Sequence, residues 1–266
     1  MIEKLDLQQL LDQITELALA VGEMQKENLG RADLAIERKS TGIDLVTEID
    51  RRSEAMITGF IAKKFPDHAI LAEEGGRRDG ASEYLWVIDP LDGTTNYAQG
   101  LPVFAISIAL QRKGEGLLGV VYAPVLGQMF TAVKGRGAWL NGRRLAVSAK
   151  KTLAECVLAT GFPYDIANHP ANNLNYFNRL VKKARGIRRM GAAAYDVAGV
   201  AAGMFDGFWE LNLSPWDVAA ARLMVEEAGG TVIPFRDDRK ISIIAGNPEI
   251  CQQILAEIRA CDQCGC

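Results

Sequence analysis

Residues 86–96 read WVIDPLDGTTN, a short hydrophobic run followed at once by two aspartates and a turn rich in Gly and Thr. The hydrophobic run predicts a buried strand whose end carries Asp89 and Asp92, where α/β scaffolds commonly present functional groups. Carboxylates are hard oxygen ligands, and Mg²⁺ prefers one or two of them together with waters and phosphate oxygens. The stretch therefore predicts a magnesium site at the end of this strand, to which the Leu91 carbonyl would add a ligand.

The same aspartates have an alternative interpretation, because Asp often caps turns and helix starts. Three other features favour a site. Glu73 and Glu74 are adjacent acids at the end of the preceding predicted strand, and such acids repel each other unless they are exposed or neutralised. Asp217 lies at the start of a predicted helix. Residues 191–193 open another helix, whose first amides are expected to receive a phosphate.

Two amphipathic helices precede the first clear strand. Apolar residues recur at spacings of three and four over residues 5–28, and again from a start near residues 44–48 to Pro66, which ends the second helix. Short β-rich runs then follow without helical spacers at residues 69–72, 84–88, 104–110, 117–122 and 129–133, and Asn141-Gly142 marks a hairpin turn. Residues 1–150 are therefore predicted to form two helices laid on an antiparallel sheet.

From about residue 152 the pattern changes to an alternation of strands and helices. Strands are predicted at residues 157–160, 187–190 and 207–211 and near residues 232 and 243, and helices at residues 173–183, 192–202, 215–230 and after Pro248. Such alternation predicts a mixed α/β half, residues 151–266, with helices on both faces of its sheet. The fold class is thus α+β, and the second half is expected to complete an active site whose metal ligands lie mostly in the first.

The composition is that of an ordinary globular protein, with 48% hydrophobic and 24% charged residues in 266. Proteins that bind the nucleic-acid backbone usually carry an excess of basic residues, whereas this chain has a net charge of −3. Direct nucleic-acid binding is therefore not expected. The N-terminus has acidic residues where a secretory signal has basic ones, and no apolar run approaches the ~20 residues that span a bilayer. A cytoplasmic protein without membrane association is expected.

The cysteines do not suggest a disulfide framework, because five is an odd number and three of them crowd the end of the chain. A soft-metal site formed by Cys261, Cys264 and Cys266 would need a fourth ligand and a rigid frame. A chain end supplies neither. The tail is therefore interpreted as a frayed end with oxidisable thiols.

Four familiar kinds of phosphate-handling site lack their residues. A phosphoaspartyl phosphatase would need a nucleophilic aspartate two residues before Asp92, where the sequence has Pro90. A P-loop and a Cys-x5-Arg cradle are both missing, and His68 and His169 are too few for a His-rich metal site. Magnesium bound by carboxylates is what remains.

These residues resemble the inositol monophosphatase family. Its two signature segments match residues 86–96 and the run PWDVAAARLMVEEAGG at residues 215–230. Supporting matches are DLVTEID at residues 44–50, Glu73-Glu74, GAAA at residues 191–194 and GFWE at residues 207–210. The resemblance covers about residues 39–247 in consistent order and implies a layered αβαβα sandwich, Mg²⁺ as cofactor, a small phosphomonoester as substrate and a homodimer.

The resemblance also implies a role for each matching residue. Metal ligands are Glu73, Asp89, the Leu91 carbonyl, Asp92 and Asp217. Catalysis is assigned to Glu73 and Thr94, which would orient the attacking water, and to Asp50 behind them. Substrate contacts are Asp92, Gly93, Thr94, Gly191, Ala193, Glu210 and Asp217, with the amides of Gly93 and Thr94 on the phosphate, and Ala193 and Glu210 on the alcohol. Lys39 would lie in a mobile loop over the metals.

The activity implied is hydrolysis of inositol monophosphate to myo-inositol and phosphate by direct attack of a water that magnesium activates. Alternatives with the same carboxylate frame are a 3'-phosphoadenosine nucleotidase, a fructose-1,6-bisphosphatase and a histidinol phosphatase. An alternative of another class is a protein that binds the transcription machinery, as some bacterial relatives are thought to do, with catalysis secondary.

Overall fold

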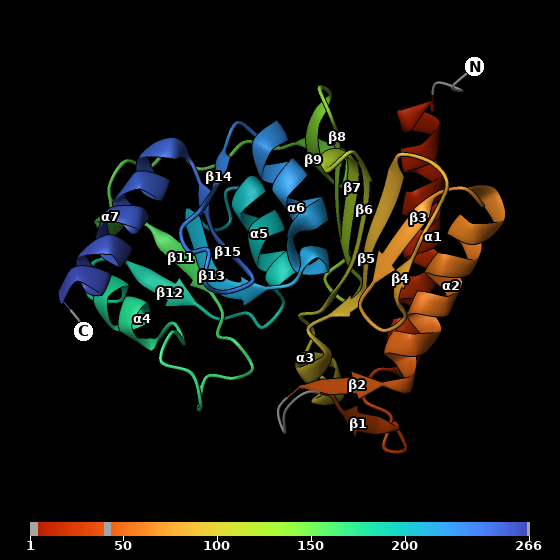
Figure 1. Ribbon diagram of the computed structural model, residues 1–266, viewed down its shortest axis with the longest axis horizontal. Coiled ribbons are helices and arrows are strands. Elements are labelled where there is room, and N and C mark those ends of the chain that lie inside the picture. Colours follow the sequence, from red (N-terminus) through yellow and green to blue (C-terminus); the bar gives the residue numbers. More distant parts are fainter. Residues whose placement is uncertain (1–4, 40–43, 265–266) are drawn as a thin grey trace.

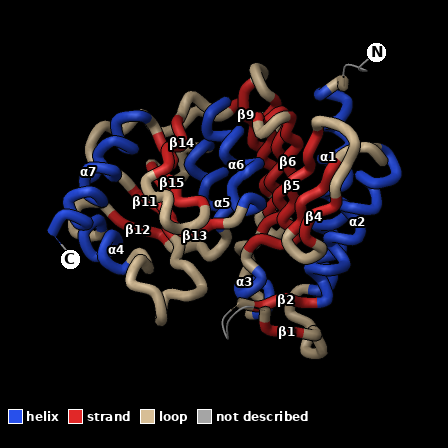
Figure 2. The backbone as a smooth tube through the Cα atoms, viewed as in Figure 1, coloured by secondary structure: helices blue, strands red, loops and turns tan. Residues whose placement is uncertain are grey.

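The structure, a computed structural model, describes residues 5–39 and 44–264, which form alternating layers of helices and sheets (Figure 1). An outer pair of helices covers an eight-stranded sheet, and a second pair separates that sheet from a five-stranded one. A third pair covers the far face of the smaller sheet (Figure 2). The expected layered αβαβα sandwich is confirmed.

The outer layer consists of α1 (Leu7–Asn28) and α2 (Glu48–Lys64), the two helices predicted from apolar spacing. Ile14 and Ile57 represent the inward faces of these helices, and both are fully buried against the large sheet. Helix α2 begins with a capping box in which Thr47 and Asp50 bond each other's backbone amides. No helix within the described ranges is long and apolar enough to cross a membrane.

The large sheet has the strand order β10-β9-β8-β7-β6-β5-β3-β4. Its strands are β3 (Ala69–Ala72), β4 (Gly76–Arg78), β5 (Tyr84–Asp92), β6 (Ala105–Arg112), β7 (Glu115–Ala123), β8 (Gln128–Val133), β9 (Gly137–Leu140) and β10 (Arg143–Arg144). The predicted hairpin at Asn141-Gly142 joins β9 to β10 and is confirmed. The expected antiparallel pairing is wrong at one place, because β5 pairs with β3 in parallel. The unpredicted β4 pairs with β3 in antiparallel fashion on the outer edge of the sheet. The chain then returns to the other side of β3, where β5 runs parallel to it.

The small sheet has the order β12-β11-β13-β15-β14 and mixes parallel and antiparallel pairs. Its strands are β11 (Val157–Thr160), β12 (Gly186–Arg188), β13 (Gly207–Leu213), β14 (Thr231–Pro234) and β15 (Ile241–Gly246). Helices α5 (Ala193–Ala201) and α6 (Pro215–Glu227) cover one face, and α4 (Leu174–Leu180) and α7 (Pro248–Cys264) cover the other. The expected helices on both faces are confirmed.

Besides β4, three further short elements were not predicted. Strands β1 (Ile36–Arg38) and β2 (Leu45–Thr47) form a two-stranded sheet, and α3 (Thr94–Ala98) follows β5 directly. Each is too short to show a clear periodicity in the sequence. Figure 1 places all three on one side of the molecule, next to the end of β5.

The core between the sheets depends on small side chains. Helices α5 and α6 are rich in alanine, and Ala198 and Ala220 are fully buried there. On β7, a Cβ at Gly119 would lie 2.8 Å from the Ala220 carbonyl oxygen, so strand and helix approach closely only because the residue is glycine. This core takes residues from both halves of the chain, and the division into residues 1–150 and 151–266 stays a prediction.

The cysteine tail differs from the expected frayed end. Helix α7 continues to Cys264, and Cys261 is only 2% exposed, in the core that α7 forms with α4. Ile254 and Ile258 lie on the same face at helical spacing, which explains the burial. The interpretation is therefore wrong for Cys261, while Cys266 and the side chain of Cys264 lie outside the described part of the chain.

Candidate metal-binding active site

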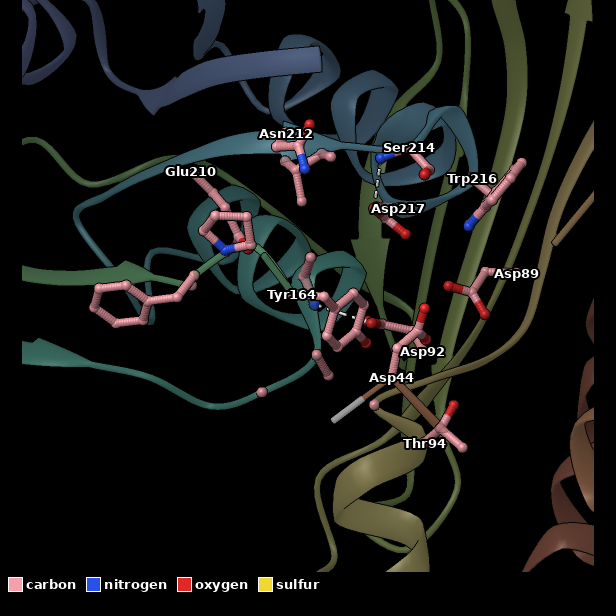
Figure 3. Close-up of a pocket in the computed structure, with 18 of the residues that line it drawn as sticks. Asp44, Asp89, Asp92, Thr94, Tyr164, Glu210, Asn212, Ser214, Trp216 and Asp217 are labelled. Carbon is pink, nitrogen blue, oxygen red and sulfur yellow. Dashed lines mark hydrogen bonds between the residues drawn. The ribbon is translucent and has the colours of Figure 1, made fainter. Parts of the chain in front are cut away.

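A cavity of about 470 Å³ lies where the ends of β3, β5 and β13 meet the starts of α3, α5 and α6 (Figure 3). It brings together most of the residues selected from the sequence. The selected residues that line it are Lys39, Glu73, Asp89, Leu91, Asp92, Gly93, Thr94, Gly191, Ala193, Glu210 and Asp217. Asp50 is absent from this lining, and it lies behind Thr94.

Asp92 ends β5 and faces the start of α5. Its carboxylate oxygens accept hydrogen bonds from the backbone amides of Ala193 (3.0 Å), Ala194 (2.8 Å) and Tyr195 (3.3 Å). Burial raises the pKa of Asp92 to about 7, although these three bonds favour the charged form. The expectation that the first amides of this helix receive a phosphate is therefore wrong for Ala193 and its two successors, because Asp92 occupies them.

Asp89 and Asp217 approach the cavity from different halves of the chain. Asp89, on β5, is 2% exposed and accepts the Leu91 amide at 3.0 Å. Asp217 lies in the first turn of α6 and accepts the Ser214 amide at 2.7 Å. Burial, and then the charges of neighbouring carboxylates, raise the pKa of Asp217 to about 8 and that of Asp89 well above its usual range.

Glu73 follows β3 and forms an ion pair with Lys39. The Lys39 ammonium donates to Glu73 Oε1 at 2.8 Å and also bonds Glu74. Burial raises the pKa of Glu73, and the nearby ammonium opposes this rise. For Lys39, burial opposes the charge, but the two glutamates hold its pKa above the usual value. The expected mobile loop continues into residues 40–43, which lie outside the described residues.

Asp50 orients the Thr94 hydroxyl. Asp50 is fully buried at the start of α2, and its Oδ1 accepts a hydrogen bond from Thr94 Oγ1 at 2.8 Å. Its Oδ2 accepts the amide and hydroxyl of Thr47 at 3.0 and 2.5 Å. Thr94 Oγ1 also lies 3.2 Å from the Leu91 carbonyl oxygen. The α2 capping box therefore fixes a hydroxyl on the cavity wall.

Glu210 lies on β13, the strand that precedes α6 and Asp217. Burial and the charge of Asp217 raise the pKa of Glu210 to about 8, while Arg189 opposes the rise. Its carboxylate packs directly on Gly161, where a Cβ would lie 2.3 Å from both oxygens. Glu210 thus contributes a buried acid to the wall formed by the second half.

Several lining residues were missed from the sequence. They are Asp44, the segment GFPYD at residues 161–165, Arg189, Asp196, Asn212 and Lys240. The segment follows β11 as an irregular loop, so neither helical nor strand periodicity marks it. The only available signal was a Gly-Phe-Pro run directly after a predicted strand, which indicates a turn but not its position beside the cavity.

The carboxylate oxygens that line the cavity are suitable ligands for Mg²⁺, although the side chains are not arranged as a preformed metal site. Within residues 5–39 and 44–264, no group of three or more His, Cys, Asp or Glu residues stands ready to hold a metal ion. Glu73 is paired with Lys39, and Asp92 with backbone amides. The oxygens are nevertheless all hard donors, and burial, with neighbouring carboxylates, raises the pKa of each acid, a cost that a bound cation would compensate.

The fold and this cavity define a class of layered αβαβα proteins with an acidic site where the two sheets meet. The chain belongs to the inositol monophosphatase family, whose model matches residues 6–263. It is 45% identical to the Nus factor SuhB of Pseudomonas aeruginosa over 95% of this chain and 97% of that protein.

Two solved structures extend the comparison. The inositol monophosphatase of Anabaena (Nostoc) sp. PCC 7120 superimposes with a TM-score of 0.86, at 39% identity over 96% of this chain and 97% of that one. An IMPase/NADP phosphatase complexed with Mg²⁺ and phosphate has a TM-score of 0.81, at 26% identity over 94% and 95% of the chains.

Proposed function

We propose that the protein is a Mg²⁺-dependent phosphomonoesterase that hydrolyses inositol monophosphate to myo-inositol and phosphate. The observation that carries the proposal is the gathering of Glu73, Asp89, Asp92 and Asp217 around one cavity, with the pKa of each carboxyl raised. Buried like charges are costly unless a cation compensates them. The solved family member that holds Mg²⁺ and phosphate supports both the cation and the substrate class.

The residues that would hold magnesium are Glu73, Asp89, the Leu91 carbonyl, Asp92 and Asp217. When bound, the ion supplies a lowered pKa for the attacking water and positive charge beside the leaving oxygen. The Lys39 ammonium occupies one position on Glu73 Oε1, and the other lone pairs of this carboxylate would bind the ion. Lys39 then remains as a nearby positive charge for the phosphate.

The chain's own groups would position the reactants. Thr94 and Glu73 orient the water, and Asp50 fixes the Thr94 hydroxyl through a 2.8 Å hydrogen bond. The amides of Gly93 and Thr94, at the start of α3, bind the phosphate oxygens. Glu210 accepts hydrogen bonds from the alcohol, which lies between it and the start of α5, where Gly191 and Ala193 line the cavity.

The test is a set of initial rates with magnesium on inositol 1-phosphate, 3'-phosphoadenosine 5'-phosphate, fructose 1,6-bisphosphate and histidinol phosphate. The highest kcat/KM is expected for inositol 1-phosphate. EDTA should remove the activity and added Mg²⁺ should restore it. A higher kcat/KM for another ester would assign the protein to the corresponding alternative phosphatase. Hydrolysis that continues in EDTA would exclude the metal-dependent mechanism.

A second function, binding to the transcription machinery, is supported by the 45% identical relative named a Nus factor. The two functions separate in a pull-down from bacterial lysate that compares the intact protein with Asp92→Asn. Equal capture of RNA polymerase subunits by both proteins would assign binding to a surface independent of catalysis. Capture of none by either protein would remove this second function.

The homodimer, the cytoplasmic location and the lack of direct nucleic-acid binding stay predictions for this chain. Sedimentation equilibrium on the purified protein decides the first, with twice the 29.0 kDa chain mass expected. A nucleic-acid binding assay at low salt, where backbone contacts are strongest, decides the third.

A further inference from the structure

The loop after β11 forms an outer wall of the cavity, and Tyr164 projects from it toward Asp92 (Figure 3). Half of the Tyr164 surface remains exposed. Figure 3 places the Tyr164 ring beside Asp92, and burial, and then the charges of Glu73, Asp44, Asp217 and Asp92, raise the pKa of Tyr164. The side chain thus has one surface open to solvent and its polar end directed at the predicted metal ligands.

The loop is held at its base by a buried amide. Asn173 is 1% exposed, and its side-chain nitrogen donates to the Gly161 carbonyl at 2.5 Å. Its oxygen accepts the Trp209 indole N–H at 2.7 Å. A backbone hydrogen bond from Ile166 to the Pro163 carbonyl (3.0 Å) closes a turn around Tyr164. Tyr164 therefore lies on a loop that these hydrogen bonds hold in one conformation.

An ion pair fixes the middle of the same loop. Arg239, between β14 and β15, donates from Nη2 to both oxygens of Asp165 at 2.7 and 2.9 Å. The Arg239 side chain is 5% exposed and the Asp165 side chain 39%, so solvent reaches the pair from the carboxylate side. Charge-assisted bonds of this kind are among the stronger ones in proteins. Their loss would free the residue directly after Tyr164.

We propose that Tyr164 is a specificity-determining residue that packs against the alcohol part of the substrate, held in place by Arg239 and Asp165 as positioning residues. The proposal rests on the proposed function, because it takes the substrate to be a phosphomonoester. A phenol ring offers a flat apolar face to the C–H groups of a ring, and its hydroxyl offers a hydrogen bond to the ring hydroxyls or the phosphate.

The comparison of a cyclic with an acyclic ester tests this choice. Tyr164→Ala should lower kcat/KM for inositol 1-phosphate at least about tenfold and that for glycerol 2-phosphate less than about threefold, because the small alcohol covers less of the ring. Tyr164→Phe keeps the ring and isolates the hydroxyl. It should retain most of the preference for the cyclic ester. Equal losses on both esters in Tyr164→Ala would overturn the proposal.

The positioning pair has a matched control on the same β14–β15 connection. Arg236 is also paired, with Asp238 and the Tyr176 hydroxyl, but does not line the cavity. Arg239→Gln should raise KM for inositol 1-phosphate about threefold or more with kcat nearly unchanged, and speed amide hydrogen exchange over residues 161–168. Arg236→Gln should change neither. Identical behaviour of the two variants would remove Arg239 and Asp165 from the proposal.

Failure of this proposal is distinguishable from failure of the proposed function. If the wild-type protein hydrolyses neither ester, the phosphatase proposal fails, and titration calorimetry with inositol 1-phosphate and Mg²⁺ then tests Tyr164 directly. Weaker binding by Tyr164→Ala than by the wild type would support the assignment. Equal affinity, or no binding by either protein, would overturn it.

Discussion

Asp92 combines a structural role and a proposed chemical role in one side chain. It joins the halves of the chain by accepting three amide hydrogen bonds from α5, and it is also a proposed metal ligand. The roles are compatible because an ionised carboxylate offers about four lone-pair positions, of which the amides use three. The start of a helix also favours negative charge there.

Asp92→Asn should therefore impair both activity and stability. We expect turnover to fall at least about 100-fold, the size seen when one key electrostatic group is lost from an active site. The melting temperature should also fall, because the new NH₂ group would face an amide N–H of α5. Asp238→Asn, at an exposed aspartate paired with Arg236, is the control and should change neither quantity. Activity above a tenth of the wild-type rate would contradict the metal-ligand assignment.

The pKa values predict how magnesium dependence changes with pH. Asp217 and Asp92 have pKa values raised to about 8 and about 7, mainly by burial. Below these values protons compete with Mg²⁺ for the carboxylates, so metal affinity should fall as the pH decreases. The half-saturating magnesium concentration, measured from initial rates, should rise steadily from pH 9 to pH 6. A concentration that is constant over this range would show that these two groups do not titrate in competition with the metal.

Short structural elements carry much of the site, and the α2 capping box shows how. Thr47 caps α2 and bonds Asp50, which in turn holds the Thr94 hydroxyl. A helix-capping motif is therefore connected to a proposed catalytic hydroxyl through two hydrogen bonds. The acidic motif at residues 44–50 suggested chemistry, while its immediate physical role is to begin a helix.

Thr47→Val tests this connection, because it removes the hydroxyl and nearly preserves the shape. Loss of a helix cap costs about 1 kcal/mol of unfolding free energy. We expect that loss in urea unfolding, together with a lower kcat because Asp50 loses one of its partners. Thr58→Val removes a hydroxyl that bonds the Glu54 carbonyl on the same helix, and it should leave kcat unchanged. An equal kcat for both variants would show that the α2 cap does not affect catalysis.

The longer elements were predictable and the shorter ones were not. The 22 residues of α1 give several turns of apolar spacing, so its boundaries follow from the sequence. Strand β4 has three residues, and α3 has five, which is too few for a period to appear. Missing β4 also led to the wrong antiparallel expectation for β5 and β3.

At the scale of the whole molecule, the layers depend on close contact between β7 and α6. Helix α6 also carries Asp217 to the cavity from the second half of the chain. The distance between the large sheet and this helix therefore affects where one proposed metal ligand lies relative to Asp89 and Asp92 on β5. Packing between the layers and assembly of the site are thus linked.

Gly119→Ala should disturb this packing more than Gly116→Ala on the same strand. A Cβ at Gly119 would lie 2.8 Å from the Ala220 carbonyl oxygen, whereas one at Gly116 would lie 3.6 Å from the Leu223 side chain, an ordinary contact. Overpacking typically costs about 1–3 kcal/mol. We expect a loss in that range for Gly119→Ala and close to none for Gly116→Ala in chemical unfolding. Equal stability of the two variants would show that β7 and α6 separate without cost.

The amino-acid sequence by itself determined the α+β class, the longer helices and strands, and the acidic residues of the site, because periodic burial and motif spacing are local properties. The layered arrangement was implied by the family resemblance. Only the tertiary structure decided what those residues meet. Asp92 bonds the start of α5 across about a hundred residues, and Lys39 pairs with Glu73. Tyr164 comes to the cavity on an irregular loop. Such contacts depend on how distant segments pack together, and local periodicity does not specify that packing.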